Sequence, residues 1–294
     1  MDEIASTDLS DTRDTINVMR LIDQERYSIT LSQHSAMNAT VAKARDDLAR
    51  LGCARISGFI RTGMHPTLVA ETDQLARSAL YSKDTYTPYG TPPDDNFPKG
   101  HPRCRTHRTT SGNVTRDLIP NDFWIQCLYQ DKKFQNFIAQ CLDAEQIFEF
   151  ADPMRGLTVN VMTQDTSLGW HFDANEFVVS LMTRRADHGG LFEYCPTIRS
   201  PGNENYASVE AVLDGSRDQV QVLDLQVGDL QIFKGRYALH RVTPVHGTRH
   251  TVLLGYSRNP GFIGSVDSTM RVYGRVMQAH IDAEHRRHAD GLTD

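Results

Sequence analysis

The chain has 294 residues, of which 39% are hydrophobic and 23% charged, and its formal net charge is -6. This composition is typical of a soluble globular protein, and the acidic balance argues against nucleic acid as a partner. No apolar run approaches the roughly 20 residues that span a bilayer, and the first residues lack the basic and apolar regions of a signal peptide. The five cysteines are scattered and never spaced as Cys-x-x-Cys, which favours a reducing, cytoplasmic setting over a disulfide framework.

The N-terminal half is expected to be mostly helical. Residues 1–15 are acidic and rich in Ser, Thr and Asp, so we expect an N-terminal extension over 1–35 that is partly disordered. After it, apolar residues recur at helical spacing, and Gly52 and Pro66 mark a helix end and a helix start. The predicted elements are a helix over 36–51, a strand over 53–60, a helix over 66–80 and a helix over 122–142 capped by Asn121 or Asp122.

A long loop is predicted over residues 81–121. Prolines, glycines and other turn formers dominate this segment, and loops of this length in compact domains are usually functional or disordered. The segment ends in a basic patch formed by His101, Arg103, Arg105, His107 and Arg108. Two interpretations stay open: the patch is part of a solvated loop, or it belongs to a lid that carries a cation for a substrate carboxylate.

The C-terminal half is predicted to be rich in strands, because several runs alternate, Gly and Pro punctuate them, and no long helix intervenes. The strands are placed at 156–164, 170–184, 189–195, 218–225, 229–234, 239–245 and 249–257. This pattern predicts a mainly β fold with flanking helices and a double-stranded β-helix core, of the jelly-roll or cupin-like type. We expect one domain over 36–294, with a helical part (36–150), the core (151–260) and a C-terminal helix (265–290) that turns its apolar side inward.

A His-x-Asp motif lies in this strand-rich half, within the stretch Trp170-His171-Phe172-Asp173. Because successive side chains of a strand alternate between faces, His171 and Asp173 project to the same side. A second stretch supplies His240 and, nine residues on, Arg249 in a new strand. Two histidines and one carboxylate with open positions form the facial triad of non-haem Fe(II) oxygenases.

A second His-x-Asp motif, at His280 and Asp282, offers an internal comparison. It lies in a helical pattern, where residues two apart do not face each other and cannot share a metal ion. No histidine and arginine follow it in a strand. We therefore expect His280 on the surface and assign the metal site to His171, Asp173 and His240.

These motifs resemble those of the Fe(II)/2-oxoglutarate-dependent oxygenases, over about residues 40–285. Within that class, four short stretches are similar to the BesD-like group, which contains free-amino-acid halogenases and their hydroxylase relatives. The stretches are Gly169 to Asp173, Gly190 to Tyr194, Leu239 to Val245 and Tyr273 to Arg275.

The resemblance implies a role for each candidate residue. The three metal ligands would hold Fe(II) and leave positions for 2-oxoglutarate and O2. Arg249 would hold the far carboxylate of 2-oxoglutarate in a two-point contact, and Thr251, on the same strand face, can add a hydroxyl. Asn160 is a candidate for the other end of the co-substrate, with a core amide paired to backbone as an equal alternative.

The resemblance also implies the chemistry and the substrate class. Oxidative decarboxylation of 2-oxoglutarate gives succinate and CO2 and drives attack on an unactivated C–H bond of a small free amino acid or analogue. In the halogenase branch a small residue replaces the carboxylate ligand and a halide takes its place. This chain keeps Asp173, which favours hydroxylation, with desaturation or ring closure as alternatives. Candidate substrate contacts are Arg103 and Arg105 for a carboxylate and Glu176 and Glu193 for an ammonium.

Two other classes of protein stay open. A non-catalytic jelly-roll binding protein would not need a complete ligand set. A 2-oxoglutarate-independent metal enzyme of the cupin type would need no arginine for the tail of the co-substrate, so Arg249 is the residue that discriminates. The sequence carries no signature of an oligomeric state.

Overall fold

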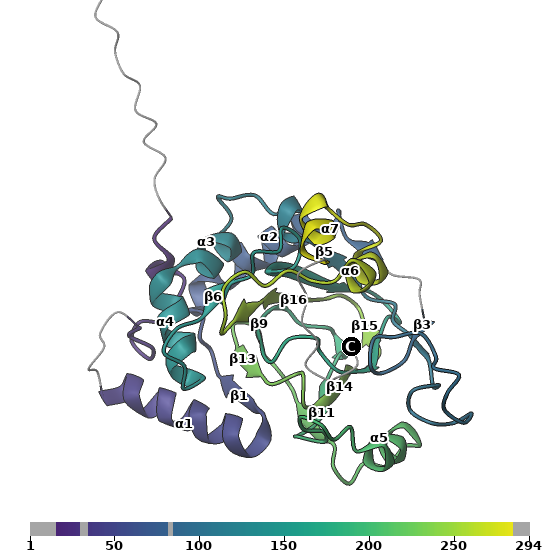
Figure 1. Cartoon of the computed structure of the whole chain (residues 1–294). Helices are drawn as coiled ribbons and strands as arrows, with labels where there is room; N and C mark the ends of the chain where they lie inside the picture. The colour runs from purple at the N-terminus through teal and green to yellow at the C-terminus, as the bar shows by residue number, and fades with distance from the viewer. Residues whose placement is uncertain (1–15, 30–34, 82–84, 285–294) are drawn as a thin grey trace, which may run out of the picture.

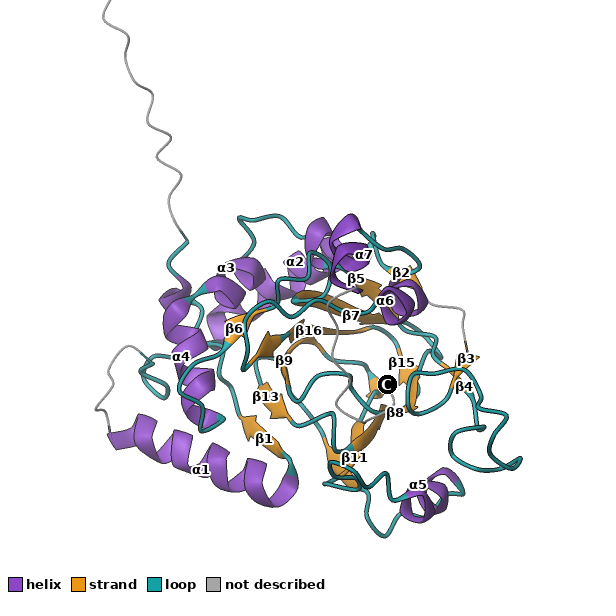
Figure 2. Ribbon diagram, in the orientation of Figure 1, coloured by secondary structure: helices purple, strands orange, loops and turns teal. Residues whose placement is uncertain are grey.

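The computed structural model describes residues 16–29, 35–81 and 85–284 (Figure 1). Two antiparallel sheets form its centre, and the fold is mainly β with flanking helices (Figure 2). From edge to edge, the larger sheet contains β1 (Cys53–Ile56), β13 (Leu230–Phe233), β9 (Val178–Arg184), β16 (Arg249–Leu254), β7 (Leu157–Met162), β5 (Gly112–Val114) and β2 (Leu80–Tyr81). The smaller sheet contains β12 (Gln221–Leu223), β11 (Phe192–Cys195), β14 (Leu239–Val242) and β8 (Leu168–His171). The predicted jelly-roll fold class is confirmed.

Short pairings and helices complete the described elements. The paired strands are β3 (Thr85–Tyr86) with β4 (His107–Arg108), β6 (Phe148–Glu149) with β17 (Tyr256–Ser257), and β10 (His188–Gly189) with β15 (Val245–His246). The helices are α1 (Ser35–Leu51), α2 (His65–Ala76), α3 (Trp124–Gln130), α4 (Lys132–Cys141), α5 (Tyr206–Leu213), α6 (Val266–Tyr273) and α7 (Gln278–Glu284). Of the helices in this part of the chain, none is both long and apolar enough to cross a membrane.

The alternation of side chains along β7 separates the core from the cavity. Every residue of this strand is buried, but Leu157, Val159 and Val161 join the main hydrophobic core, whereas Thr158 and Asn160 line a cavity. Helices α1, α2 and α4 supply the other side of that core (Figure 1). The helical N-terminal half therefore covers the outer face of the larger sheet and leaves its inner face for the site.

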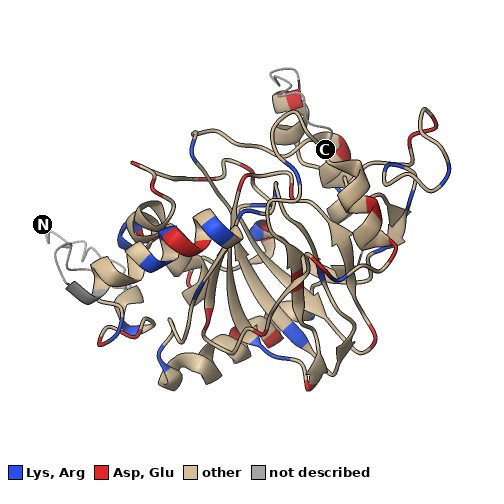
Figure 3. Ribbon diagram, turned by 90° about the horizontal axis from the view of Figure 1, so that it is seen from below, with Lys and Arg blue, Asp and Glu red and all other residues tan. Residues whose placement is uncertain are grey.

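One ion pair joins a helix to the larger sheet, and another joins two neighbouring strands of that sheet. Arg184 of β9 donates to the Asp73 carboxylate of α2 at 2.6 Å, and Arg55 of β1 lies 2.6 Å from Asp229, just before β13. In Figure 3 basic and acidic residues are interspersed over the described elements. The Arg184–Asp73 pair is partly exposed, and exposed pairs contribute about 0–1 kcal/mol each, so burial of the apolar core holds the layers together.

The helix predicted over 122–142 is two helices, α3 and α4, because the backbone is extended at Asp131 (φ -69°, ψ 122°). Asp131 caps α4 by accepting hydrogen bonds from the amides of Lys133 and Phe134. The predicted cap at Asn121 or Asp122 is wrong, since Phe123 precedes α3. The first amides of α3 instead donate to the carboxylate of Glu71 on α2.

The strand predicted over 170–184 is also two strands, β8 and β9, which lie in different sheets. The strand predicted over 53–60 ends at Ile56, and α5 was not predicted. The ends of these short strands depend on pairing with strands that are distant in the sequence, and local periodicity does not encode that pairing.

The predicted C-terminal helix breaks at Gly274, which adopts a left-handed conformation (φ 68°) and separates α6 from α7. The apolar side of this segment does not face inward as expected, since Met270 of α6 and Ile281 of α7 are 47% and 44% exposed. His280, expected on the surface, is fully buried, and its Nε2 lies 3.2 Å from both carboxylate oxygens of Asp152. The surface prediction for His280 is wrong. Residues 285–290 of this predicted helix lie outside the described residues.

We expect His280→Ala to destabilise the fold. Nδ1 of His280 accepts from the Met277 amide, so Nε2–H donates to Asp152, whose buried carboxylate would lose one partner. Such a loss costs about 1–3 kcal/mol, measurable as a lower free energy of unfolding in urea. The control is Asp282→Ala, in the exposed half of the same motif, which should change stability by less than about 0.5 kcal/mol. Equal stabilities for the two variants would contradict the buried pair.

Candidate metal centre

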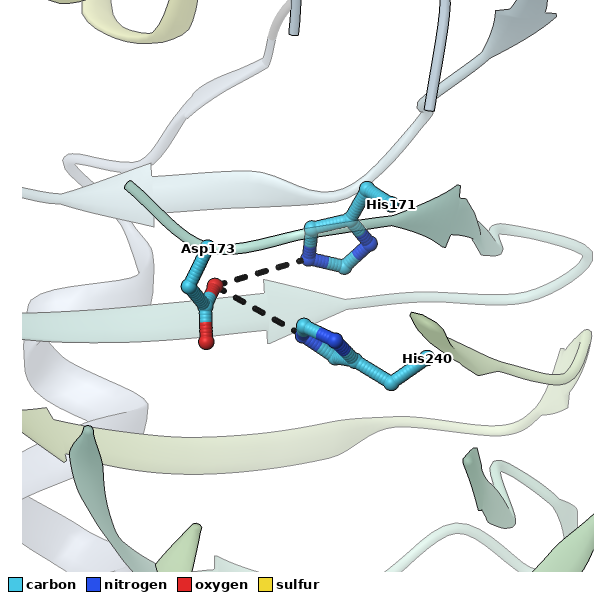
Figure 4. A group of neighbouring side chains, drawn as sticks. All are labelled: His171, Asp173 and His240. Atoms are coloured by element: carbon cyan, nitrogen blue, oxygen red, sulfur yellow. Dashed lines mark ion pairs between the residues drawn. The ribbon is translucent and has the colours of Figure 1, made fainter. Parts of the chain in front are cut away.

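Three metal-ligating side chains converge between the two sheets. His171 ends β8 and pairs in register with His240 of β14, and their ring centroids lie 4.0 Å apart. Oδ1 of Asp173 is 3.9 Å from Nε2 of His171 and 3.5 Å from Nε2 of His240. Figure 4 shows that carboxylate oxygen directed at both imidazoles. The candidate ligand atoms all lie within 4.8 Å of one another, so one metal ion can contact all three.

Backbone carbonyls fix the tautomer of both histidines. Nδ1 of His171 lies 2.8 Å from the Gly169 carbonyl oxygen, and Nδ1 of His240 lies 2.9 Å from that of Ala238. A carbonyl oxygen only accepts, so Nδ1 carries the proton and Nε2 presents its lone pair to the shared point. Protein metal sites commonly hold their histidines in this way.

Electrostatics keep these groups in the protonation states that a metal ion needs. Burial, assisted by the nearby His240, lowers the pKa of His171 to about 3, so its imidazole is neutral near pH 7. Burial alone would raise the pKa of Asp173, but the neighbouring His240 and His171 outweigh it and hold that pKa below its usual value. A neutral imidazole and an ionised carboxylate are both ligands for a divalent cation.

Asp173 does not lie in the strand that carries His171. β8 ends at His171, and Asp173 follows in a loop whose main chain is fixed by two hydrogen bonds. The Phe172 amide donates to the Pro88 carbonyl at 2.8 Å, and the Asp173 amide donates to the Gly235 carbonyl at 3.1 Å. The expected side-by-side placement therefore arises from loop contacts and not from strand alternation.

Arg249 and Thr251 place unpaired polar atoms on the inner face of β16. Both residues are about 4% exposed, and neither Nε of Arg249 nor Oγ1 of Thr251 has a hydrogen-bond partner among the described residues. Burial lowers the pKa of Arg249 to about 10, which leaves it protonated near pH 7. A buried cation without a partner is costly, so this position suits an anionic ligand such as the far carboxylate of 2-oxoglutarate.

A cavity of about 360 Å³ opens beside the three ligands. His171 and Asp173 line it together with Asn160 and Leu253, and Leu253 shares its strand face with Arg249 and Thr251. Asn160 pairs in register with Thr251, and its Nδ2 is 3.4 Å from both the Gly112 carbonyl oxygen and Asn113 Oδ1. The guanidinium of Arg249 does not line the cavity but lies deeper, 4.0 Å from the Met162 sulfur.

The predicted loop over 81–121 contributes a wall of this cavity. Tyr86, Tyr89, Ser111 and Asn113 are among its lining residues. Arg103 is buried behind that wall, with its guanidinium 5.3 Å from the centre of the Tyr89 ring. The segment is therefore not a solvated loop, because it packs against the site. The cation expected from a lid is not found in the cavity lining at Arg103.

The other predicted substrate contacts lie away from the cavity, and each has a partner within the protein. Glu193 is buried on β11 and accepts hydrogen bonds from Arg217 and Arg241 at 2.6 Å each, which lowers its pKa. Glu176 accepts from Arg258 at 3.0 Å. Arg105 pairs with Asp214 on the far side of α5. None of these three predicted residues lines the cavity next to His171 and Asp173.

Sequence reasoning missed the charged residues that do line the cavity. Asp267 and Arg271, one turn apart on α6, form an ion pair, and both line the cavity. Arg155 is also in the lining and donates to Ser268 Oγ at 2.9 Å, which holds α6 in place. No motif marks these residues in the sequence; only the packing of α6 against the strands brings them to the site.

The sequence matches the model of the Halogenase D family over residues 36–272. The chain belongs to this family. A comparison with curated protein sequences found no match.

Solved structures share the fold at low sequence identity. A prolyl hydroxylase from Trichoplax adhaerens is 14% identical with a TM-score of 0.51, covering 76% of this chain and 94% of its own. AviO1 from Streptomyces viridochromogenes is 16% identical with a TM-score of 0.50, covering 75% and 94%. SnoN, a non-haem α-ketoglutarate-dependent epimerase, is 12% identical with a TM-score of 0.50, covering 74% and 79%. Family and fold place this Halogenase D member among the Fe(II)/2-oxoglutarate-dependent oxygenases, which use Fe(II), 2-oxoglutarate and O2.

We expect His171→Ala and His240→Ala each to abolish tight Fe(II) binding, because each removes one of three protein ligands. The loss should exceed the roughly 10–100-fold that an outer-shell partner contributes. Anaerobic calorimetric titration with Fe(II) measures the affinity, and succinate formation from 2-oxoglutarate measures the consequence. His246→Ala is the control, since its side chain is 59% exposed and outside the cluster. Near wild-type affinity in either ligand variant would refute the assignment.

Proposed function

We propose that the protein hydroxylates an unactivated C–H bond of a small free amino acid or a close analogue, and that it releases succinate and CO2. The observation that carries this proposal is the complete cluster of His171, Asp173 and His240 beside the cavity, with the buried cation Arg249 on β16 of the larger sheet. A non-catalytic binding protein would not need the complete ligand set, and a 2-oxoglutarate-independent metal enzyme would need no arginine for the tail of the co-substrate.

The residues of this chain have distinct tasks in the proposed reaction. His171 and His240 would hold Fe(II) through Nε2, and Asp173 would hold it through its carboxylate. When bound, Fe(II) with 2-oxoglutarate and O2 supplies the oxidant that cleaves the C–H bond. Arg249 anchors the co-substrate with a charge-assisted contact, and the hydroxyl of Thr251 adds a second donor on the same face.

The cavity wall shields the reacting bond from bulk water. Leu168, Phe172, Val178 and Leu253 present apolar surface around the ligands. Excluding water from a site strengthens electrostatic contacts within it and suppresses side reactions.

Charges on α6 support a zwitterionic substrate. Asp267 and Arg271 line the cavity and pair with each other, and the Asp267 side chain is 79% exposed; a free amino acid, whose ammonium and carboxylate lie close together, would exchange partners with this pair. A volume of about 360 Å³ falls at the small end of ligand pockets. A small molecule therefore suits this cavity better than a peptide or a protein segment.

Asp173 favours hydroxylation over halogenation within the Halogenase D family. Its carboxylate occupies a ligand position and brings negative charge beside the metal, which disfavours a second anion there. Halogenation is the second candidate, because the family model carries that description. Desaturation and ring closure are further outcomes of the same C–H cleavage.

Arg249→Ala should raise the 2-oxoglutarate concentration needed for half-maximal succinate formation by roughly two orders of magnitude. Truncating one partner of a buried charge pair typically costs about 2–5 kcal/mol. Fe(II) affinity, measured by anaerobic titration, should remain close to wild type, because Arg249 is not a metal ligand. A variant with normal 2-oxoglutarate saturation but weakened binding of the prime substrate would reverse the assignment.

Wild-type enzyme, incubated with a panel of free amino acids, Fe(II), 2-oxoglutarate, O2 and excess chloride, should convert one of them to a product that carries one added oxygen atom. Loss of two hydrogen atoms would indicate desaturation or ring closure instead. Mass spectrometry distinguishes these products. A dominant product with the isotope pattern of chlorine would refute hydroxylation, and turnover of no amino acid would refute the substrate class.

A further inference from the structure

Gly235 lies directly against the carboxylate of Asp173, in the segment that joins β13 to β14. A Cβ added to Gly235 would overlap Oδ2 of Asp173 and would lie only 2.5 Å from its Cγ. Favourable contacts between carbon atoms lie near 3.5–4.0 Å. No residue with a side chain can therefore occupy position 235 while Asp173 keeps its present rotamer.

Space, and not backbone conformation, explains the glycine at this position. Many glycines of this chain, such as Gly228 and Gly274, have positive φ angles that disfavour other residues, but Gly235 is not one of them. A left-handed φ is therefore not what requires glycine at position 235. Because Gly235 has no side chain, the space beside it is left for the Asp173 carboxylate.

The two carboxylate oxygens of Asp173 have different surroundings. Oδ1 is directed at Nε2 of both His171 and His240, whereas Oδ2 points away from the imidazoles (Figure 4) and rests against Gly235. A methyl group at position 235 would push Oδ2 aside. Because both oxygens belong to one rigid group, Oδ1 would then rotate away from the point that the histidines share.

Neither backbone can withdraw easily to relieve such an overlap. The Asp173 amide donates to the Gly235 carbonyl at 3.1 Å, which joins the two segments directly. On the Gly235 side, the Lys234 amide donates to the Gly52 carbonyl at 2.8 Å. Nη1 of Arg236 donates to the Ala174 carbonyl at 2.7 Å and joins the two segments a second time.

We propose that Gly235 is a positioning residue of the metal centre, whose missing side chain admits the Asp173 carboxylate as the third protein ligand. The proposal rests on the proposed role of Asp173 as a ligand. The size of residue 235 decides whether a carboxylate at position 173 can reach the metal, although residue 235 itself does not contact the metal.

The test is a double-mutant cycle read out as Fe(II) affinity in anaerobic calorimetry. Gly235→Ala should weaken Fe(II) binding at least about 10-fold, as loss of an outer-shell partner does. In an Asp173→Gly background the same substitution should cause no further loss. Glycine is used at 173 because the Cβ of Asp173 also lies 2.9 Å from the added methyl. The control is Gly63→Ala, since a Cβ there meets nothing within 4 Å and Gly63 has no positive φ.

Each outcome of the cycle decides one question. Unchanged affinity in Gly235→Ala, or an equal loss in both backgrounds, overturns the inference while the role of Asp173 stands. Wild-type affinity in Asp173→Gly alone overturns the ligand assignment of the proposed function. If Gly235→Ala lowers Tm or fails to fold, combining it with Asp173→Gly should restore folding. Absence of that rescue also overturns the inference, because the overlap would then not involve the carboxylate.

Discussion

The pairing of β8 with β14 is the constraint on which the site depends. It sets His171 opposite His240, and two imidazoles that face each other across neighbouring strands already define most of a metal site. Both strands belong to the smaller sheet, whose position follows from the packing of its inner face against the larger one. A slip of one residue would turn either histidine to the opposite face. Strand register therefore fixes the two histidines, whereas loop contacts place Asp173.

The ligand cluster could be predicted from the sequence because coordination chemistry restricts the residue types and the His-x-Asp spacing keeps His171 close to Asp173. Strand alternation was the wrong reason for that closeness, since β8 ends at His171 and Asp173 is placed by loop contacts. The strand-rich half and the first two helices follow from periodicity. The roles of individual polar residues could not be predicted from the sequence in this way. Glu193 meets Arg241 only because β11 and β14 pair in one register, and no local pattern encodes that pairing.

The C-terminal segment shows why periodicity failed there. A continuous helical pattern ran through Gly274, but the left-handed turn at that residue restarts the helix and changes which face is buried. His280 thereby reaches Asp152 in the core, and the apolar residues around it are left exposed. Burial of a histidine was unexpected from hydrophobic patterning, since the pattern carries no information on a distant carboxylate.

The position of α6 has a consequence for the order in which the enzyme is assembled. All three candidate metal ligands precede α6 in the chain, yet α6 supplies one wall of the cavity. During synthesis, the strands that carry the ligands leave the ribosome before that wall does. A chain that ended before α6 would still contain all three candidate ligands but would lack Asp267, Arg271 and the rest of that wall. The residues that could hold a metal ion and the residues that bound the cavity on this side are therefore supplied by separate parts of the sequence.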